Sequence, residues 1–553
     1  MVRRKKSKPV IQSLKKQSRQ RSSDARIVCF IFLGVIIIFF SWFRIHLLSF
    51  PLERDEGEYA YFGQLILQGI PPYSMAYNLK MPGIYYCYAF IMWLFGQTPT
   101  GIHLGLLFFN IGSILFLFFV IRKLSNDFVA LLATSSFALL SVSPVLLGQA
   151  AHATQFVTFF MLAGLWFLVK GFDRNHGWWF LLSGILFSIA FLMKQSGIFF
   201  TLFGGVMILL WYFFHHDRIG FGKILLRLVL FSAGAAFPVA LVFLIMKHLG
   251  VFENFWFWTM VYPGVYGSKV PFSEAWNMLR INFSPMVSIF TGLWILAALG
   301  IPSIIFYPAA KWNKSFILLF LFFSMLTVIP GFYFRQHYFI PLLPAVGWMI
   351  GIFLDTINQK ISPWFKGIPW VTGAFFLVLV IIPIRQQKGW FFDMDPVTLC
   401  RFVYAGNPFT ESIPVARYIE TNTSLYDKIL IFGSEPQLAF YSGRKSATGY
   451  IYMYDLVYDH PYVGKMQDEM FREAEESKPA MAIFVSVPYS WLARPEVSDT
   501  LFRWFNDYLV RNQFKTVGVV ELKNPPESSI YAWDQDAAVY QRQSDQFMMI
   551  FKR

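Results

Sequence analysis

The chain has 553 residues, of which 56% are hydrophobic and 14% are charged, and its formal net charge is +15. Soluble proteins carry about 25% charged residues, and disorder requires low hydrophobicity, so the composition excludes a soluble enzyme and a disordered chain. With a mean hydropathy of +0.49, the sequence predicts a membrane protein with many spans. The basic excess also raises the question of a nucleic-acid surface, which the distribution of the charges decides.

The N-terminal segment predicts the orientation of the chain. Residues 1–26 hold ten Lys and Arg residues against one acid, Asp24, and they lead into an apolar run at 27–49. That run is long enough to cross a bilayer of about 30 Å, and no small-residue cleavage site follows it. We interpret 1–26 as a basic cytoplasmic tail and 27–49 as an uncleaved signal anchor.

Residues 27–385 are predicted to form a transmembrane domain of about eleven helices. Its first external loop, 50–100, contains the aromatic stretch 84–95, which is too short to cross and is expected to lie at the interface or to re-enter the membrane. The expected fold class is an α-helical polytopic membrane protein with a C-terminal soluble α/β domain. After the first span, the others are expected near 101–121, 128–147, 151–170, 178–193, 198–214, 226–247, 286–307, 315–333, 338–354 and 368–384.

The charges test this topology, because Lys and Arg concentrate in loops on the cytoplasmic side. The tail and the loops assigned to that side hold 21 basic and five acidic residues, a net charge of +16. The outer side of the membrane domain has a net charge of +2, and residues 385–553 have a net charge of −3. The basic excess therefore reports topology and attraction to anionic lipids, and no surplus is left for a nucleic-acid surface.

Residues 386–553 are predicted to form a periplasmic or extracellular α/β domain. The turn-rich stretch 433–444 is expected to be a surface loop, with a ligand-binding loop as the alternative. Segments whose hydrophobic residues have helical spacing alternate with short runs that are rich in β-branched and aromatic residues. These runs indicate strands at 428–433, 480–487, 516–522 and 547–553.

A cluster of carboxylates follows the first span on its outer side. Glu53, Asp55, Glu56 and Glu58 lie within six residues, at a helix end where charges are costly unless they are paired or used. Acids also favour the first turn of a helix, so the cluster alone is equally typical of a solvated helix start. Lys80 follows in a turn of the same external loop, bounded by Pro and Gly.

Three further outer turns carry polar groups at span ends. A single Lys or Arg in such a place usually extends to lipid head groups. Several cations opposite a carboxylate cluster instead indicate a site for an anionic lipid head group with a base nearby. The residues concerned are His152, Gln155, Lys194, Arg335, His337 and Tyr338.

The outer loop 248–285 contains three consecutive aromatic residues, Trp256, Phe257 and Trp258. Aromatic side chains of this kind form belts at membrane interfaces. We favour that role over a lid that closes on a substrate.

Six motifs at the outer span ends follow one another in the chain. They are DEGEYAYFGQLILQG (55–69), KMPG (80–83), WLFG (93–96), SPVLLGQAAHATQF (143–156), MKQSG (193–197) and RQHYFIPLLPA (335–345). In this order they resemble bacterial members of the C-type (GT-C) glycosyltransferase superfamily. The nearest branch includes the protein O-mannosyltransferases and the aminoarabinose transferase acting on lipid A. The resemblance covers roughly residues 27–385 and extends only loosely to the C-terminal domain.

The resemblance implies roles for the site residues. It makes Asp55 the catalytic base, with Glu56 beside it, and it makes Lys80 a ligand of the donor phosphate. Many relatives carry an acid where this chain has Gln155, so a divalent metal is possible but doubtful, and no metal ligand or other cofactor is assigned. The other residues expected at the phosphate or substrate are Arg335, Lys194, His337, Tyr338, Glu58 and His152.

The implied function is transfer of a sugar from a polyprenyl-phosphate donor to a glycan, lipid or protein acceptor. It would take place among membrane lipids at the outer face of the cell inner membrane, with Asp55 as base and with inversion. We rank the phosphate ligands as Lys80, then Arg335, then Lys194. Two alternatives stay open: a polytopic secondary transporter, which predicts charges at the membrane midplane and internal repeats, and a membrane-anchored glycan-binding or assembly protein.

Overall fold

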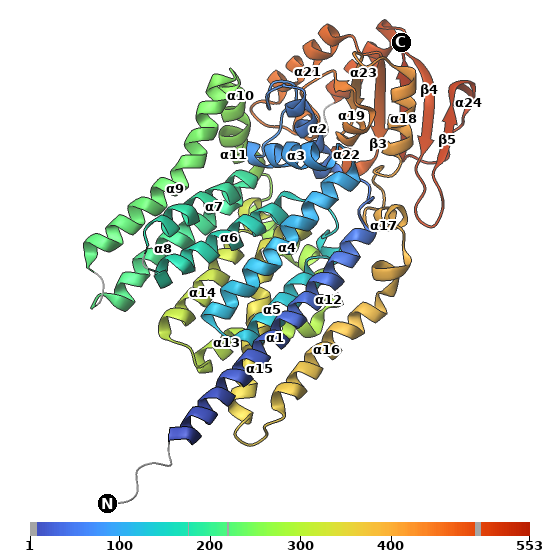
Figure 1. The fold of residues 1–553 in the computed structure, drawn as a ribbon. Helices are drawn as coiled ribbons and strands as arrows, with labels where there is room; N and C mark the ends of the chain where they lie inside the picture. The colour runs from blue at the N-terminus through green and yellow to red at the C-terminus, as the bar shows by residue number, and fades with distance from the viewer. Residues whose placement is uncertain (1–7, 175, 218–219, 493–498) are drawn as a thin grey trace, which may run out of the picture.

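A computed structural model describes residues 8–174, 176–217, 220–492 and 499–553. A bundle of long helices carries the C-terminal α/β domain at one end, and α2 and α3 lie between the two (Figure 1). The predicted basic tail falls partly on residues 1–7, which lie outside the described residues. The bundle helices are α1 (Lys8–His46), α4 (Pro99–Leu124), α5 (Asp127–Leu140), α6 (Ala153–Arg174), α7 (Trp178–Met193), α8 (Ile198–His215), α9 (Phe221–His248), α12 (Phe272–Ile289), α13 (Thr291–Phe306), α14 (Lys311–Leu326), α15 (Leu343–Ile361) and α16 (Ile368–Gln386).

Each of the eleven expected spans contains a helix, but those expected at 128–147 and 315–333 have α-helices that end at Leu140 and Leu326. Among the described residues, seven helices are long and apolar enough to cross a membrane, or eight if one bent pair counts as a single span. That pair is α12 and α13, which meet at 107° around Phe290, so the span expected at 286–307 is continuous only from Thr291. The helices α5, α7 and α14 have 14, 16 and 16 residues. At 1.5 Å per residue they are shorter than a bilayer core of about 30 Å.

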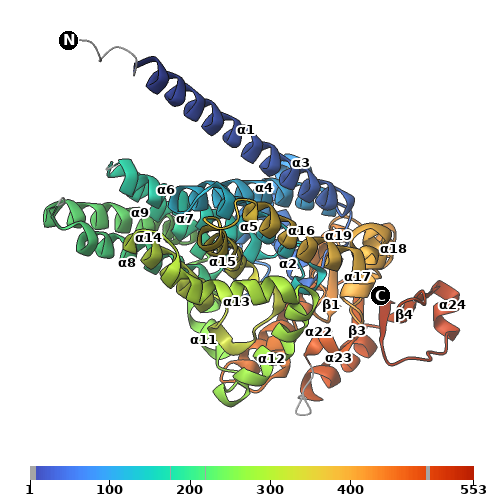
Figure 2. The ribbon, with the colours of Figure 1, turned by 90° about the horizontal axis from the view of Figure 1, so that it is seen from below.

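Small residues allow close packing between helices of the bundle. The pairs α5–α15, α6–α7 and α7–α9 make extensive contacts, and α5 and α15 lie among the other helices in the view from below (Figure 2). Gly184 of α7 and Gly234 of α9 each approach a backbone carbonyl of the other helix, of Phe231 and Leu181 respectively, so closely that a Cβ atom has no room. Small residues serve the same purpose in membrane helices generally.

The first external loop forms α2 (Arg54–Leu67) and α3 (Pro82–Phe95). The α2 helix begins with a capping box, in which Glu53 and Glu56 each accept a hydrogen bond from the backbone N–H of the other. Pro82 opens α3 in the first turn, where its missing N–H is harmless. As expected for an interfacial segment, α3 lies across the end of the bundle rather than along it (Figure 1).

The C-terminal domain contains one mixed sheet in the order β2-β1-β3-β6-β4-β5. The strands β1, β2 and β3 are parallel, whereas β6 pairs antiparallel with β3 and β4. The four expected strands are confirmed as β1 (Lys428–Phe432), β3 (Met481–Ser486), β4 (Lys515–Glu521) and β6 (Phe547–Lys552), while the short strands β2 (Lys445–Ser446) and β5 (Ile530–Trp533) escaped prediction. The helices are α17 (Pro396–Val403), α18 (Ser412–Asn422), α19 (Gln437–Ser442), α20 (Tyr454–Val457), α21 (Val463–Ser477), α22 (Pro488–Trp491), α23 (Asp499–Arg511) and α24 (Asp534–Val539).

The two parts of the chain meet along a buried seam. The expectation of a surface loop at 433–444 is wrong, because this stretch forms α19 and packs on α2, with Gln437 against Gly57. The hydroxyl of Tyr441 accepts a hydrogen bond from the N–H of Leu52 at 2.8 Å. No local pattern indicates this burial, since the partner lies almost 400 residues away in the chain.

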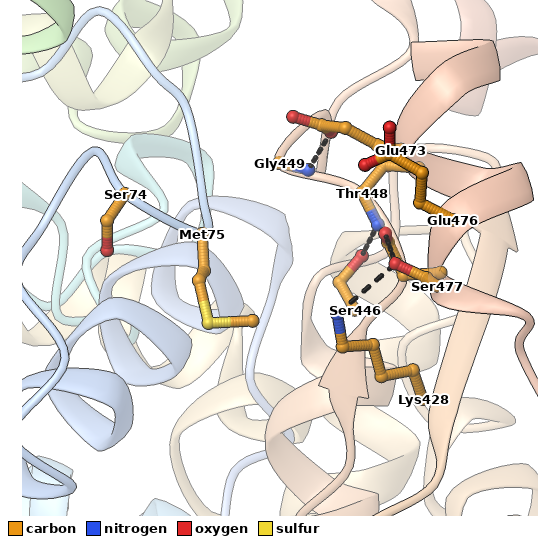
Figure 3. A pocket seen from close by; sticks show the side chains of 10 residues that line it. Ser74, Met75, Lys428, Ser446, Thr448, Gly449, Glu473, Glu476 and Ser477 are labelled. Atoms are coloured by element: carbon orange, nitrogen blue, oxygen red, sulfur yellow. Dashed lines mark hydrogen bonds between the residues drawn. The ribbon is translucent and has the colours of Figure 1, made fainter. Parts of the chain in front are cut away.

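A polar cavity of about 230 Å³ lies in this seam, between the turn at Ser74 and Met75 and the terminal domain (Figure 3). Its polar groups bond to one another. Glu473 accepts the N–H of Gly449 at 2.8 Å, and the hydroxyl of Ser477 donates to the carbonyl of Ala447 at 2.7 Å. These groups join the elements of the terminal domain.

The outer loop 248–285 packs partly on the terminal domain. It forms α10 (Phe252–Trp256), a short π-helix η3 (Phe257–Val261) and α11 (Tyr262–Gly267). Trp256 is 43% exposed, as a belt residue would be, whereas Trp258 is 4% exposed and contacts Tyr77 and Tyr450. The burial of Trp258 does not fit an aromatic belt, whereas for the exposed Trp256 that role stays a prediction.

Candidate active site

The first turn of α2 presents Asp55 to a cluster of basic groups. One carboxylate oxygen of Asp55, Oδ2, lies 3.5 Å from Nζ of Lys80 and 3.9 Å from a ring nitrogen of both His152 and His337. Burial opposes ionisation, but the surrounding cations, Lys80 foremost, hold the pKa of Asp55 well below its usual range. The cluster therefore contains a carboxylate that is ionised at neutral pH.

Lys80 is fixed from several sides. Its ammonium donates to the hydroxyl of Tyr59 at 3.0 Å, and its backbone carbonyl accepts the hydroxyl of Tyr73 at 2.7 Å. Burial favours the neutral amine, but Asp55 and Glu58 outweigh it and raise the pKa of Lys80 above its usual range. Lys80 is consequently a preorganised cation beside the carboxylate.

Arg335 and Lys194 supply further basic groups from other helix ends. The guanidinium of Arg335 donates to the hydroxyl of Tyr266 at 3.3 Å, and this residue foremost raises the pKa of Arg335. Lys194 lies over the ring of Tyr338, with Nζ 3.2 Å from the ring centroid. Burial and then the charge of Lys80 lower the pKa of Lys194 well below its usual range. A bound anion would favour protonation of this amine.

Two histidines close the cluster. The rings of His152 and His337 are stacked, with centroids 4.1 Å apart. Burial lowers the pKa of His152 to about 4, against the opposing effect of Asp55, so its ring is neutral at neutral pH. Among the described residues, neither nitrogen of His152 has a hydrogen-bond partner, nor does Nδ1 of His337. Buried nitrogens of this kind are available to a ligand.

Asp55, His152 and His337 could also hold a metal ion, because each offers one ligand atom and these atoms lie within 4.8 Å of one another. A carboxylate with two imidazoles suits a transition metal such as Zn²⁺ better than Mg²⁺. Lys80, however, contacts the same carboxylate oxygen of Asp55, and its charge opposes a dication. The ligand types fit a metal and the local charge disfavours it.

Glu56 is placed differently from its neighbour Asp55. Its side chain is fully buried, and Oε1 contacts Nε2 of His103 at 2.9 Å and accepts the N–H of Ala151 at 2.6 Å. These contacts join α2 to α4 and to the turn before α6. The carboxylate is thus occupied within the protein, and we assign Glu56 a structural role in place of the catalytic one expected beside Asp55.

Glu58 and Gln155 border the cluster. Glu58 accepts the hydroxyl of Tyr85 at 2.6 Å, and burial raises its pKa to about 8 although Lys80 opposes the shift. The amide of Gln155 donates to the carbonyl of Gly148 at 3.2 Å and holds the turn that carries His152.

A cavity of about 370 Å³ opens beside Asp55, and the terminal domain contributes to its wall. The hydroxyl of Tyr452 donates to the carbonyl of Arg54 at 3.1 Å and lies 3.5 Å from Oδ1 of Asp55. Arg54 in turn forms a buried ion pair with Glu435 at 2.9 Å. Sequence reasoning missed these domain contacts, although the tyrosine-rich stretch 450–454 was a visible signal. The additional lining residues include Tyr454, Tyr489 and Leu492.

Comparison with known proteins agrees with this arrangement. The model of the family described as dolichyl-phosphate-mannose-protein mannosyltransferase matches residues 80–243. The structure of ArnT from Cupriavidus metallidurans bound to undecaprenyl phosphate is similar, with a TM-score of 0.54 and 15% identity over 94% of this chain and 97% of that one. This chain shares the fold of ArnT, a GT-C glycosyltransferase.

A second GT-C structure is also similar. It is the archaeal oligosaccharyltransferase AglB from Archaeoglobus fulgidus, in complex with an inhibitory peptide and a dolichol-phosphate. Its TM-score is 0.54 and its identity 12%, over 92% of this chain and 75% of that one. A search of curated proteins finds no match. The expected fold class, an α-helical polytopic membrane protein with a C-terminal α/β domain, is confirmed, and the chain is a multi-pass membrane protein.

Proposed function

We propose that this chain is a GT-C glycosyltransferase, which transfers a sugar from a polyprenyl-phosphate donor to an acceptor at the outer face of the cell inner membrane. The observation that carries the proposal is the ionised Asp55, which lies beside Lys80 and two histidines and lines the cavity of about 370 Å³. ArnT and AglB, whose fold this chain shares, were each solved with a polyprenyl phosphate. A similar lipid anion is the natural complement of these basic groups.

The chemistry is a single displacement. The acceptor hydroxyl oxygen attacks the anomeric carbon, the bond from that carbon to the phosphate oxygen breaks, and its electron pair stays on the lipid phosphate. Asp55 takes the hydroxyl proton, which as general-base catalysis is worth a factor of about 10²–10⁴. Attack opposite the leaving group inverts the anomeric carbon.

The basic groups stabilise the charge that develops on the phosphate. Lys80 and Arg335 remain protonated in the free protein, whereas the amine of Lys194 would gain a proton when an anion binds. We therefore keep the order Lys80, Arg335, Lys194. These cations supply positive charge without a metal ion. His337 and Tyr338 shape the cavity around the phosphate.

Bound phosphate also tunes the base. Its negative charge offsets the field of Lys80 and Arg335 at Asp55, and the pKa of Asp55 rises toward its usual range. The carboxylate then accepts a proton more readily than in the free protein, so donor binding prepares the base.

Neither alternative function gains support from the site. A transporter predicts ionisable groups near the membrane midplane, whereas this cluster lies at the end of the bundle beneath the terminal domain. A simple binding or assembly protein gives no task to Asp55 and its basic neighbours. The orientation we propose has the N-terminus in the cytoplasm and the terminal domain outside.

The test is Asp55→Asn in membranes supplied with undecaprenyl-phosphate-linked radiolabelled sugars. We expect transfer to fall by a factor of about 10²–10⁴, because the amide cannot accept the proton. Asp468→Asn, which removes an exposed carboxylate on α21, serves as the matched control and should leave transfer unchanged. Wild-type activity in a folded Asp55→Asn protein would contradict the proposed role of Asp55 as the base.

A further inference from the structure

A second cavity of about 400 Å³ lies between the outer loop 248–285 and the terminal domain. Its walls come from the first external loop, from α10 and η3, and from α21. It shares no lining residue with the cavity of about 370 Å³ beside Asp55, which we call the catalytic cavity. The mechanism proposed above gives it no task.

Aromatic rings build the walls of this cavity. The rings of Tyr77 and Trp258 are stacked 5.7 Å apart, and the ring of Tyr450 stands edge-on to both, at 5.3 and 6.0 Å. Tyr462 meets Phe257 edge-on at 5.1 Å. Mutual packing fixes these rings, so they present a rigid apolar surface with little entropy left to lose on binding.

Acidic and basic side chains surround the rings. Glu253 and Lys465 are exposed, and Glu469, which accepts the hydroxyl of Tyr450 at 2.8 Å, is half-buried. The cavity thus offers carboxylate acceptors and an ammonium donor beside flat apolar walls. A sugar ring presents the complementary surface, with hydroxyls that both donate and accept and a C–H face that packs on aromatic rings.

We propose that this aromatic cavity binds a carbohydrate, as a subsite for a sugar unit of the acceptor away from the transfer point. The assignment to the acceptor rests on the proposed function; the binding of sugar does not. One short segment of the terminal domain links the two cavities, because Tyr450 lines the aromatic cavity while Tyr452 and Tyr454 line the catalytic one. An acceptor with several sugar units is therefore the substrate class that this arrangement fits.

A small cation and a phosphate fit this cavity less well than a sugar does. A small cation would favour the aromatic rings and the carboxylates, but Lys465 at the rim repels it. A phosphate would meet Glu253 and Glu469. The cavity of Figure 3 has no aromatic wall, and its polar groups bond to one another.

The test measures binding to the full-length Asp55→Asn protein in detergent, so that turnover is not needed. The probes are free tetrasaccharides of mannose, glucose, galactose and N-acetylglucosamine, with tetramethylammonium as the cationic probe. We expect at least one tetrasaccharide to bind in the millimolar range or tighter. Glu253→Gln combined with Lys465→Met should weaken it about tenfold, because hydrogen bonds to charged groups are lost.

The matched control pairs Asp507→Asn with Arg503→Met, two exposed charges on α23 that line none of these cavities. This control variant should bind the tetrasaccharide as tightly as the Asp55→Asn protein with Glu253 and Lys465 unchanged. The proposal is overturned if no tetrasaccharide binds, if the rim variant binds as tightly as the control, or if tetramethylammonium alone binds. Retained transfer by the Asp55→Asn protein would contradict the proposed base without affecting this result.

Discussion

Two cavities between the helical bundle and the terminal domain differ in the hydrogen bonding of their polar groups. In the cavity of Figure 3, Glu473 and Ser477 bond to the backbone of the terminal domain. In the catalytic cavity, both ring nitrogens of His152 and one of His337 have no hydrogen-bond partner among the described residues. Leaving buried polar atoms unpaired destabilises a fold. The bonded groups of the first cavity indicate a structural role, and the unpaired nitrogens of the second indicate a site for a ligand.

Asp55 and Glu56, which are neighbours in the first turn of α2, also differ in whether their polar groups are bonded within the protein. Glu56 uses its carboxylate to join α2 to His103 and Ala151, whereas Asp55 faces the cavity with its basic groups. Glu56 is fully buried, whereas the side chain of Asp55 is 15% exposed. Together with the different partners, this predicts different effects when the two carboxylates are replaced.

For the comparison of the two cavities, the largest effect is expected at Lys80, which lies beside Asp55. Lys80→Met should lower transfer by a factor of about 10²–10³, as for the loss of a preorganised charge that stabilises a leaving group. Lys428→Met is the matched control, since Nζ of Lys428 donates to Ser477 in the cavity of Figure 3 at 3.2 Å. Transfer assays that show equal losses in both variants would erase the distinction between the cavities.

Glu56→Gln should act on stability rather than on chemistry. Loss of the charge weakens the contacts to His103 and Ala151 inside the protein, and the free energy of unfolding should fall by about 2 kcal/mol or more. Thermal unfolding in detergent measures this loss, and transfer per folded molecule should stay within about threefold of wild type. A normal melting temperature with abolished transfer would instead return Glu56 to the catalytic machinery.

A pH effect is expected at Glu58. Burial raises its pKa from 4.5 to about 8, so the folded protein keeps a proton that the unfolded chain releases between these values. The free energy of unfolding should therefore fall as pH rises from about 4.5 to about 8. Thermal unfolding of Glu58→Gln should show a flatter pH profile than wild type, with the largest relative gain near pH 8. Parallel profiles would contradict the raised pKa.

The smallest effect is expected in the cavity of Figure 3. Ser477→Ala removes a hydrogen bond to the carbonyl of Ala447, which should cost about 1 kcal/mol of stability and leave transfer unchanged. Denaturation and transfer assays on one preparation measure both. A large loss of transfer would assign this cavity a part in the reaction.

The helices and the outer layer of charged span ends could be predicted from the sequence. Hydropathy locates the helices, and the distribution of Lys and Arg puts Asp55, Lys80, Lys194 and Arg335 on one side of the membrane. The break at Phe290 could not be predicted, because an apolar run reads the same whether its helix is straight or bent.

The missing parts of the site depend on partners distant in the chain. The task of Glu56 follows from His103, 47 residues away, and the approach of Tyr452 to Asp55 spans 397 residues. The burial of α19 likewise comes from α2. Local patterns carry no information about such pairs. Those of Tyr452 and α19 arise only when the terminal domain packs on the first external loop.

A structure of the full-length protein with undecaprenyl phosphate tests the central claim most directly. We predict that the phosphate lies in the cavity beside Asp55, within hydrogen-bond distance of Lys80, and with Arg335 as its next cation. Phosphate bound elsewhere on the chain, with Lys80 and Asp55 still paired to each other alone, would contradict the account.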